Sequence, residues 1–252
     1  MADLSIVMPC YNEASRKNFE YRLNKLYSYM LDDTDIEFEL ILVNDGSTDN
    51  TLEVLEKFAK DKGNFVIVDV ISYDKNVGKG YALKQGISHA RGTYTLMIDA
   101  DLNIPLKNIQ KFYNYIQIAT LHHLVIGNRT NEYNKSPIRK FLTKSAKICT
   151  KKLIGIKKNG DTQCGFKMFT TDRVQSILKY IKSDRWLFDI ELILYMQALG
   201  EKVRYIDVKS RNELPSTINS REALFTSIKE LLIILRYKNQ TIYKIKKRRN
   251  KE

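Results

Sequence analysis

Two carboxylates one residue apart, Asp99 and Asp101, are the residues in this sequence best suited to chemistry. They follow a short apolar run, 94–98, whose composition is typical of a buried strand. Ligands of open α/β sheets gather at the carboxyl ends of the strands, where an Asp-x-Asp pair offers hard oxygen ligands to a divalent cation and a phosphorylated substrate. The alternative interpretation is local, with Asp101 or Asn103 capping a helix that Pro105 opens.

Two further polar loops follow predicted strands earlier in the chain. The apolar run 4–8 leads into Pro9–Glu13, and the run 38–43 leads into Asn44–Asp49. The carboxyl ends of parallel strands lie along one edge of a sheet. These loops are therefore expected to meet the Asp99–Asn103 loop at a single cleft.

Side chains in these loops suit a nucleotide. Asp45 could accept hydrogen bonds from a nucleobase or ribose, and Tyr11 could stack on a base. Taken alone, Asp45 fits a turn and Tyr11 fits a packing role, but the loops together favour nucleotide binding. Gly78-Lys-Gly80 lacks the GxGxxG and GxxxxGK[ST] spacings of phosphate-binding loops. Lys79 could nevertheless approach a phosphate, or it could be a solvated loop lysine.

The alternation of apolar runs and helical patterns predicts the fold class. Helical patterns of about ten to fifteen residues between strands indicate βαβ units, and hence an α/β fold with a mostly parallel sheet flanked by helices. The expected strands are 4–8, 38–43, 65–70, 94–98, 124–127 and 202–208, and the segment 161–169 is expected to be a loop that enters a further strand. From Arg221 the apolar residues repeat at helical spacing. We expect a catalytic domain over 1–219, then an amphipathic helix and basic tail over 220–252.

Charge and composition bound the partners. The chain has 252 residues and a net charge of +13, and residues 236–252 hold eight Lys or Arg against one acid. Such an end attracts either nucleic acid or an anionic membrane surface. A nucleic-acid module would need interleaved aromatic residues or a recognised fold, and the tail offers only Tyr237 and Tyr243, so no nucleic acid is expected. The amphipathic helix instead favours a peripheral position on a membrane.

Cysteine spacing and hydropathy bear on location. The three cysteines, Cys10, Cys149 and Cys164, form no CxxC pair, so reduced thiols are expected. No segment resembles a signal peptide, and no apolar run approaches the length of a membrane span. We therefore expect a cytoplasmic protein that binds the cytoplasmic face of a membrane.

Four segments in order resemble the motifs of family 2 glycosyltransferases with the GT-A fold. They are Ile6–Glu13, Val43–Asp49, Asn76–Gly80 and Ile98–Leu102. Two narrower segments, Asp161–Lys167 and Arg185–Glu191, are similar to the branch that glycosylates polyprenyl phosphates. Within that branch they resemble dolichyl-phosphate β-glucosyltransferases first and dolichyl-phosphate mannose synthases next. The resemblance covers roughly residues 3–211.

The resemblance implies an inverting transfer of a hexose from a nucleotide sugar, assisted by Mg²⁺ or Mn²⁺. The segment Gln163–Phe166 favours UDP-glucose as donor, with GDP-mannose as the alternative. The implied catalytic and metal-binding residue is Asp101, with Asp99 as a second metal ligand. The residues expected to bind the nucleotide sugar are Pro9, Tyr11, Glu13, Asp45, Lys79, Asp99 and Ala100.

The acceptor decides whether a general base is needed. A polyprenyl phosphate is already anionic and needs only positioning and charge pairing. The basic residues in the stretches where this branch keeps its phosphate contacts are Arg129, Arg139, Lys167 and Arg211, although each could instead form a surface salt bridge. The alternative acceptor is a hydroxyl of a glycan or cell-wall polymer, which requires a base, and Asp189 is the candidate. Glu191 lies two residues further along a helix and is expected to face elsewhere.

Overall fold

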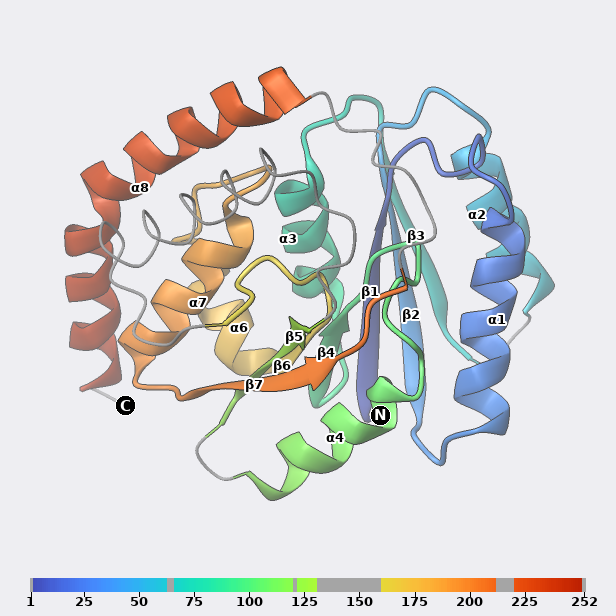
Figure 1. Cartoon of the computed structure of the whole chain (residues 1–252), viewed down its shortest axis with the longest axis horizontal. Coiled ribbons are helices and arrows are strands. Elements are labelled where there is room, and N and C mark those ends of the chain that lie inside the picture. Colours follow the sequence, from blue (N-terminus) through green and yellow to red (C-terminus); the bar gives the residue numbers. More distant parts are fainter. Residues whose placement is uncertain (1, 63–65, 120–121, 131–159, 212–219, 251–252) are drawn as a thin grey trace.

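The computed structural model describes residues 2–62, 66–119, 122–130, 160–211 and 220–250 (Figure 1). Within these residues a seven-stranded sheet has the order β3-β2-β1-β4-β6-β5-β7. The strands are β1 Leu4–Cys10, β2 Phe38–Asp45, β3 Val68–Tyr73, β4 Tyr94–Met97, β5 Leu124–Arg129, β6 Lys167–Thr170 and β7 Val203–Val208. β6 is antiparallel to β4 and β5, and the other pairs are parallel. The predicted α/β fold with a mostly parallel sheet is confirmed.

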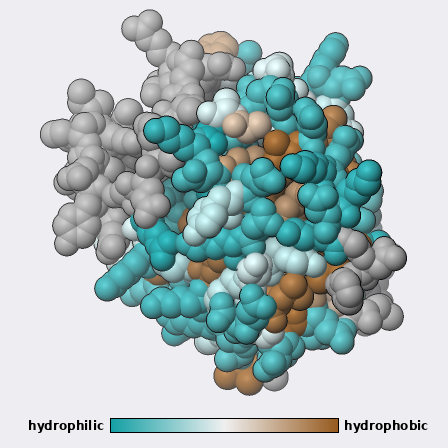
Figure 2. Space-filling view, turned by 90° about the vertical axis from the view of Figure 1, so that its right-hand side faces the viewer, coloured by the Kyte–Doolittle hydropathy of each residue, from teal (hydrophilic) through white to brown (hydrophobic). Residues whose placement is uncertain are grey.

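Helices cover both faces of the sheet. They are α1 Phe19–Asp32, α2 Thr51–Asp61, α3 Lys79–His89, α4 Asn108–Ile118, α6 Thr171–Leu178, α7 Phe188–Leu199 and α8 Ser220–Arg249. Figure 1 shows α1 and α2 on one side of β1–β3 and α3 on the other, where α3 packs on β1 and β2. α6 packs on α3 and α7, and α8 packs on α7. The α1–α2 side of the molecule is mostly hydrophilic (Figure 2).

Burial explains why the central strands read as unbroken apolar runs. All eight residues of β2 are buried, and in β1 only Pro9 is partly exposed. Helices on both faces leave no solvated side on which polar residues could alternate. Glu39 of β2, an acid within these strands, is 1% exposed and must therefore be paired.

Two elements begin three residues later than the sequence predicted. The third strand begins at Val68 rather than at residue 65. The helix expected from Pro105 begins at Asn108, so neither Asp101 nor Asn103 caps it. The Asp101 carboxylate instead accepts hydrogen bonds from Asn103, at 3.1 Å from its backbone nitrogen and 2.7 Å from Nδ2. The helix-cap interpretation of this acid is wrong, because a folded loop separates it from α4.

Cys10 and Cys164 are free and buried, and Cys149 lies outside the described residues. Burial raises the pKa of the Cys164 thiol to about 11. Burial also raises the pKa of the Cys10 thiol, and the negative charge of nearby Glu13 raises it further. Since the thiolate is the reactive form, neither described cysteine is suited to act as a nucleophile at neutral pH.

Glu39 gives a prediction about acid stability. Its carboxylate accepts hydrogen bonds from Ser5 Oγ at 2.6 Å and from Arg91 Nε at 2.8 Å. Burial alone would raise the pKa of Glu39, but these donors and the Arg91 charge outweigh it and hold the pKa below its ordinary value. We expect Glu39→Gln to lower the free energy of unfolding by about 2 kcal/mol at pH 7, the scale of hydrogen bonds to a charged group.

The sign of the pH dependence follows from the lowered pKa. The stabilisation is fully present above the unfolded-state pKa, about 4.3, and is lost as the pH falls through the folded-state value. Urea unfolding at several pH values should show the wild type and Glu39→Gln converging in acid. Glu56→Gln, at an exposed position on α2, is the control. A stability difference that stays constant down to the acid limit of folding would contradict this account.

Candidate active site

One edge of the sheet collects the predicted loops. Parallel register pairs Cys10 of β1 with Asn44 of β2 and Val7 of β1 with Met97 of β4, so these strands end on the same side. Antiparallel β6 begins at that edge, where Lys167 pairs with Met97 and with Ile126 of β5. The loops after β1, β2 and β4 therefore meet there, as the sequence predicted, together with the segment that enters β6.

The first two loops are joined by hydrogen bonds. The backbone N–H of Asn12 donates to Ser47 Oγ at 3.0 Å, and the backbone N–H of Thr48 donates to Asn12 Oδ1 at 2.8 Å. Asn12 has a φ of +50°, in the left-handed region that asparagine tolerates better than most residues. This junction leaves Tyr11 44% exposed at the sheet edge, available for stacking. Asn12 was part of a recognised motif, but its bridging role was not predicted.

Glu13 connects the first loop to the Asp-x-Asp loop through Arg22 of α1. Arg22 Nη2 lies 3.1 Å from Glu13 Oε2, and Arg22 Nε donates to the carbonyl oxygen of Ala100 at 2.8 Å. Burial raises the pKa of Glu13, although Arg16 and Arg22 oppose the shift. Glu13 and Ala100 are thus framework for the site. Sequence reasoning missed Arg22, whose signal was an arginine on the apolar face of its helix.

Asp45 holds the loop that leads into α3, of which Lys79 is the first residue. Its carboxylate accepts hydrogen bonds from Tyr73 Oη and Asn76 Nδ2, both at 2.8 Å, and from the backbone N–H of Gly78 at 3.0 Å. Gly78 needs a φ of +131°, and a Cβ there would lie 2.6 Å from a backbone oxygen. These donors already engage the Asp45 carboxylate. Its predicted contact with a nucleoside stays a prediction.

The two aspartates differ in surroundings. The Lys79 ammonium is paired with Asp99, and Gly165 lies against the same carboxylate. Burial alone would raise the pKa of Asp99, but Lys79, with help from nearby Lys167 and Arg129, holds the pKa below its ordinary value. Burial, with Asp99 nearby, raises the pKa of Asp101. A cation placed between substrate and Asp101 would relieve that repulsion.

Two of the predicted phosphate contacts lie beside the aspartates. Arg129 forms an ion pair with Asp161, with Nη2 at 3.1 Å from Oδ1. Lys167 is 0% exposed, and its Nζ lies 2.6 Å from Asp189 Oδ1. The positive charges of Lys167 and Arg129 both help to lower the pKa of Asp99. Lys167 thus acts on the site from within the protein, as the buried partner of Asp189.

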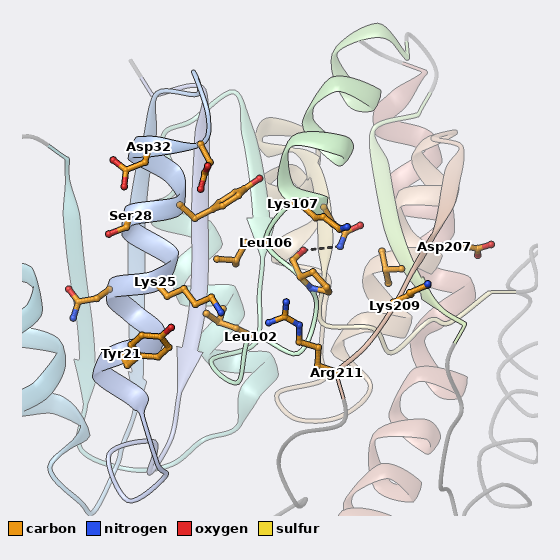
Figure 3. Close-up of a pocket in the computed structure, with 16 residues that line it drawn as sticks. Tyr21, Lys25, Ser28, Asp32, Leu102, Leu106, Lys107, Asp207, Lys209 and Arg211 are labelled. Atoms are coloured by element: carbon orange, nitrogen blue, oxygen red, sulfur yellow. Dashed lines mark hydrogen bonds between the residues drawn. The ribbon is translucent and has the colours of Figure 1, made fainter.

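The other two predicted phosphate contacts, Arg139 and Arg211, are not among the side chains placed beside Asp99 and Asp101. Arg139 lies outside the described residues. Arg211 lines a groove of about 830 Å³, into which it and Lys25 of α1 extend from opposite sides (Figure 3). Its backbone N–H donates to the carbonyl oxygen of Asn103 at 2.8 Å, which ties the end of the β7 segment to the Asp-x-Asp loop. Arg211 therefore borders the site through its backbone.

Glu191 faces away from the site, as predicted. Its carboxylate accepts hydrogen bonds from the backbone N–H groups of Lys182 at 2.9 Å and Ser183 at 2.6 Å, and from Tyr195 Oη at 2.8 Å. It is 0% exposed. Asp189, on the same helix, is the acid that pairs with Lys167 beside Asp99.

The donor set fits a divalent cation that is shared with a substrate. Among the described residues no group of three or more metal-ligating side chains occurs. Mg²⁺ is commonly held by one or two carboxylates together with substrate phosphates, and Asp101 and Asp99 are two such carboxylates. Asp99 is engaged by Lys79, so Asp101 is the better placed of the two.

The comparisons with known proteins agree with this geometry. The model of the family described as glycosyl transferase family 2 matches residues 5–183. The chain belongs to this family. The relatives include dolichyl-phosphate beta-glucosyltransferase ALG5A of Trichomonas vaginalis, 33% identical over 98% of this chain and 77% of that protein. The dolichyl-phosphate beta-glucosyltransferase of Saccharomyces cerevisiae is 32% identical over 76% of this chain and 61% of that protein.

Solved structures support the same fold. Glucosyl-3-phosphoglycerate synthase from Mycobacterium tuberculosis, in complex with phosphoglyceric acid, covers 91% of this chain and 80% of its own with a TM-score of 0.66 and 18% identity. Its complex with Mn²⁺, UDP-glucose and phosphoglyceric acid gives a TM-score of 0.64 and 17% identity at the same coverage. This family 2 member is therefore a glycosyltransferase with the predicted GT-A fold. None of its described helices has the length and apolar character needed to cross a bilayer.

Gly165 of this glycosyltransferase provides a prediction. A Cβ at that position would lie 2.1 Å from Asp99 Oδ2, so Gly165→Ala must displace the carboxylate. We expect transfer to slow by about 100-fold, the cost of misplacing a reacting group by about 1 Å. Turnover and thermal unfolding of the variant and the wild type would be measured side by side.

Gly86→Ala is a matched control for overpacking. Its Cβ would lie 2.3 Å from Val7 Cγ1, in the core between α3 and β1. Both variants should lose stability, but only Gly165→Ala should lose most of its activity. Equal losses of activity in the two would contradict a role for Gly165 at Asp99.

Proposed function

We propose that this enzyme transfers glucose from UDP-glucose to a polyprenyl phosphate of the dolichyl type, with inversion and with the assistance of Mg²⁺ or Mn²⁺. The observation that carries the proposal is the 33% identity with a dolichyl-phosphate beta-glucosyltransferase over 98% of the chain. The basic residues beside Asp99 support an anionic acceptor. GDP-mannose is the alternative donor.

The residues of the sheet edge take separate roles in this proposal. Tyr11 stacks on the base, and Asp45 and Glu13 shape the nucleoside side of the site. Asp101, with Asp99, holds the metal. A bound divalent cation supplies Lewis-acid stabilisation of the negative charge that gathers on the departing diphosphate. Lys79 is placed to add positive charge on the same side.

The surroundings of Asp189 favour a phosphate acceptor over a hydroxyl. A hydroxyl must lose a proton to a base, whereas a phosphate is already anionic. One oxygen of Asp189 is held by the buried Lys167 at 2.6 Å, which suits a structural anion better than a proton acceptor. Arg129 then pairs with the acceptor phosphate, and Arg139 and Arg211 are proposed as further contacts. Transfer to a glycan hydroxyl with Asp189 as base is the rival.

Turnover measurements test the proposal. Purified full-length protein with Mn²⁺ or Mg²⁺ would be given UDP-glucose or GDP-mannose with a short polyprenyl phosphate, the corresponding polyprenol or a glycan. We expect a glucosylated polyprenyl phosphate, dependent on metal and on the phosphate. Transfer to the polyprenol or the glycan alone would overturn the phosphate acceptor, and transfer from GDP-mannose alone would overturn the donor.

We also propose that α8 holds the enzyme on the cytoplasmic face of a membrane. Its outer side exposes large apolar residues, among them Phe225 and Leu232, each 62% exposed. Its last turn contains Lys246, Lys247, Arg248 and Arg249. Buried apolar area supplies interfacial affinity, and each basic residue near anionic lipid adds about 1 kcal/mol.

Sedimentation with vesicles of phosphatidylcholine and phosphatidylserine tests this attachment. Leu232→Asp should weaken binding, because it places a charge on the apolar side of α8. Ile118→Asp, at an 81% exposed residue at the end of α4, is the matched control and should bind as the wild type does. Equal binding by Leu232→Asp and the wild type would refute the role of α8.

A further inference from the structure

The inner side of α8 is part of the folded protein. Ile234 and Ile245 are each 1% exposed, and Glu230 on the same helix is 7% exposed. Figure 1 shows α8 curving around α7, on which it packs. The helix therefore has two distinct sides, an exposed apolar one and an inner one that carries a buried carboxylate.

The Glu230 carboxylate binds three successive backbone N–H groups. Oε1 accepts from Arg185 at 2.8 Å, and Oε2 accepts from Trp186 and from Leu187, each at 2.9 Å. These residues lead directly into α7, whose N-cap residue, Leu187, makes no side-chain capping hydrogen bond. Free N–H groups at the start of a helix favour an anion. Glu230 of α8 supplies that anion, although it lies 43 residues after Leu187 in the chain.

The segment held by Glu230 lies between two parts of the active site. Upstream, the carbonyl oxygen of Asp184 accepts a hydrogen bond from the backbone N–H of Tyr81 at 2.8 Å, near the start of α3. A Cβ on Gly80, next to Lys79, would lie 2.8 Å from the Asp184 carbonyl carbon. Downstream, Asp189 follows in the first turn of α7. The backbone at 184–187 thus contacts the first turn of α3, where Lys79 lies, and leads into the helix that carries Asp189.

We infer that Glu230 is a positioning residue, which makes the placement of Asp189 and Lys79 depend on the seating of α8. The carboxylate fixes the backbone immediately before Asp189, and Asp189 fixes Lys167 beside Asp99. Its effect on catalysis rests on the proposed function, whereas its effect on the backbone does not.

Hydrogen exchange and kinetics of full-length Glu230→Gln test the inference. The glutamine keeps the shape but loses the charge and one acceptor oxygen. We expect amide exchange in residues 185–191 to rise by about 10- to 100-fold, and kcat to fall by a similar factor, as hydrogen bonds to a charged group are lost. We expect kcat to fall by more than the KM for UDP-glucose rises, because the hydrogen bonds that join the β1 and β2 loops do not involve Glu230.

Control variants separate positioning from general destabilisation. Glu56→Gln makes the same change on exposed α2, on the opposite side of the molecule, and should leave exchange and kcat unchanged (Figure 1). Glu230→Asp keeps the charge and should recover part of the lost kcat. Ile234→Ala loosens α8 without touching the carboxylate, and it should increase exchange in 185–191 in the same direction.

Unchanged exchange in residues 185–191 of Glu230→Gln would overturn the inference. So would a fall in thermal stability with kcat unchanged, because a purely structural contact predicts that result. If the wild type shows no turnover with any acceptor, the proposed function fails. The exchange measurement then decides by itself whether Glu230 fixes the backbone before Asp189.

Discussion

Asp101→Asn should lower the rate of sugar transfer by about 1000-fold or more, which corresponds to about 4 kcal/mol of transition-state stabilisation. The side chain keeps its size, so Asn103 still finds an acceptor in the loop. The charge that would hold a divalent cation against the diphosphate is lost. We expect the loss mainly in kcat at saturating metal, because the charge on the leaving group develops in the transition state.

Two comparisons make this result specific to the site. Asp35→Asn removes the same charge at an exposed position between α1 and β2 and should leave turnover unchanged. Thermal unfolding of Asp101→Asn should resemble that of the wild type, because Asp101 is partly exposed and bonds only within its own loop among the described contacts. Turnover within about tenfold of the wild type would show that the reaction does not use this carboxylate.

Lys167→Met should be the most destabilising substitution in the site. It leaves Asp189 buried without its cation, and breaking a buried pair in this way costs about 3–5 kcal/mol. The double variant Lys167→Met/Asp189→Leu removes both charges and should recover most of that stability. It should not recover transfer, because the positive charge that Lys167 adds to those of Lys79 and Arg129 near Asp99 is then missing. Urea unfolding and turnover of the single and double variants provide the measurements.

This pair also changes how the acceptor should be tested. Asp189→Asn alone cannot distinguish a catalytic base from a structural anion, because it also strands the fully buried Lys167 ammonium. A double variant that stayed as unstable as Lys167→Met would contradict the pairing. A double variant with full activity would show that neither charge serves the reaction.

The contrast between Lys167 and Arg211 shows where sequence reasoning stopped. Both are basic residues in stretches typical of phosphate contacts. The structure buries Lys167 against Asp189 and places the Arg211 side chain in a groove beside α1. Their exposure depends on which elements pack beside them, and the sequence pattern around each residue does not indicate this.

The sequence by itself determined the α/β fold, the edge at which the loops meet and the Asp99–Asp101 pair. It could do so because buried parallel strands require continuous apolar runs, and these runs end at one edge. Only the tertiary structure decided what each polar side chain contacts. Arg22 reaches Ala100 across 78 residues, and Glu230 reaches Arg185 across 45. Such contacts form between elements far apart in the chain, so the packing of the helices on the sheet determines them and periodicity does not.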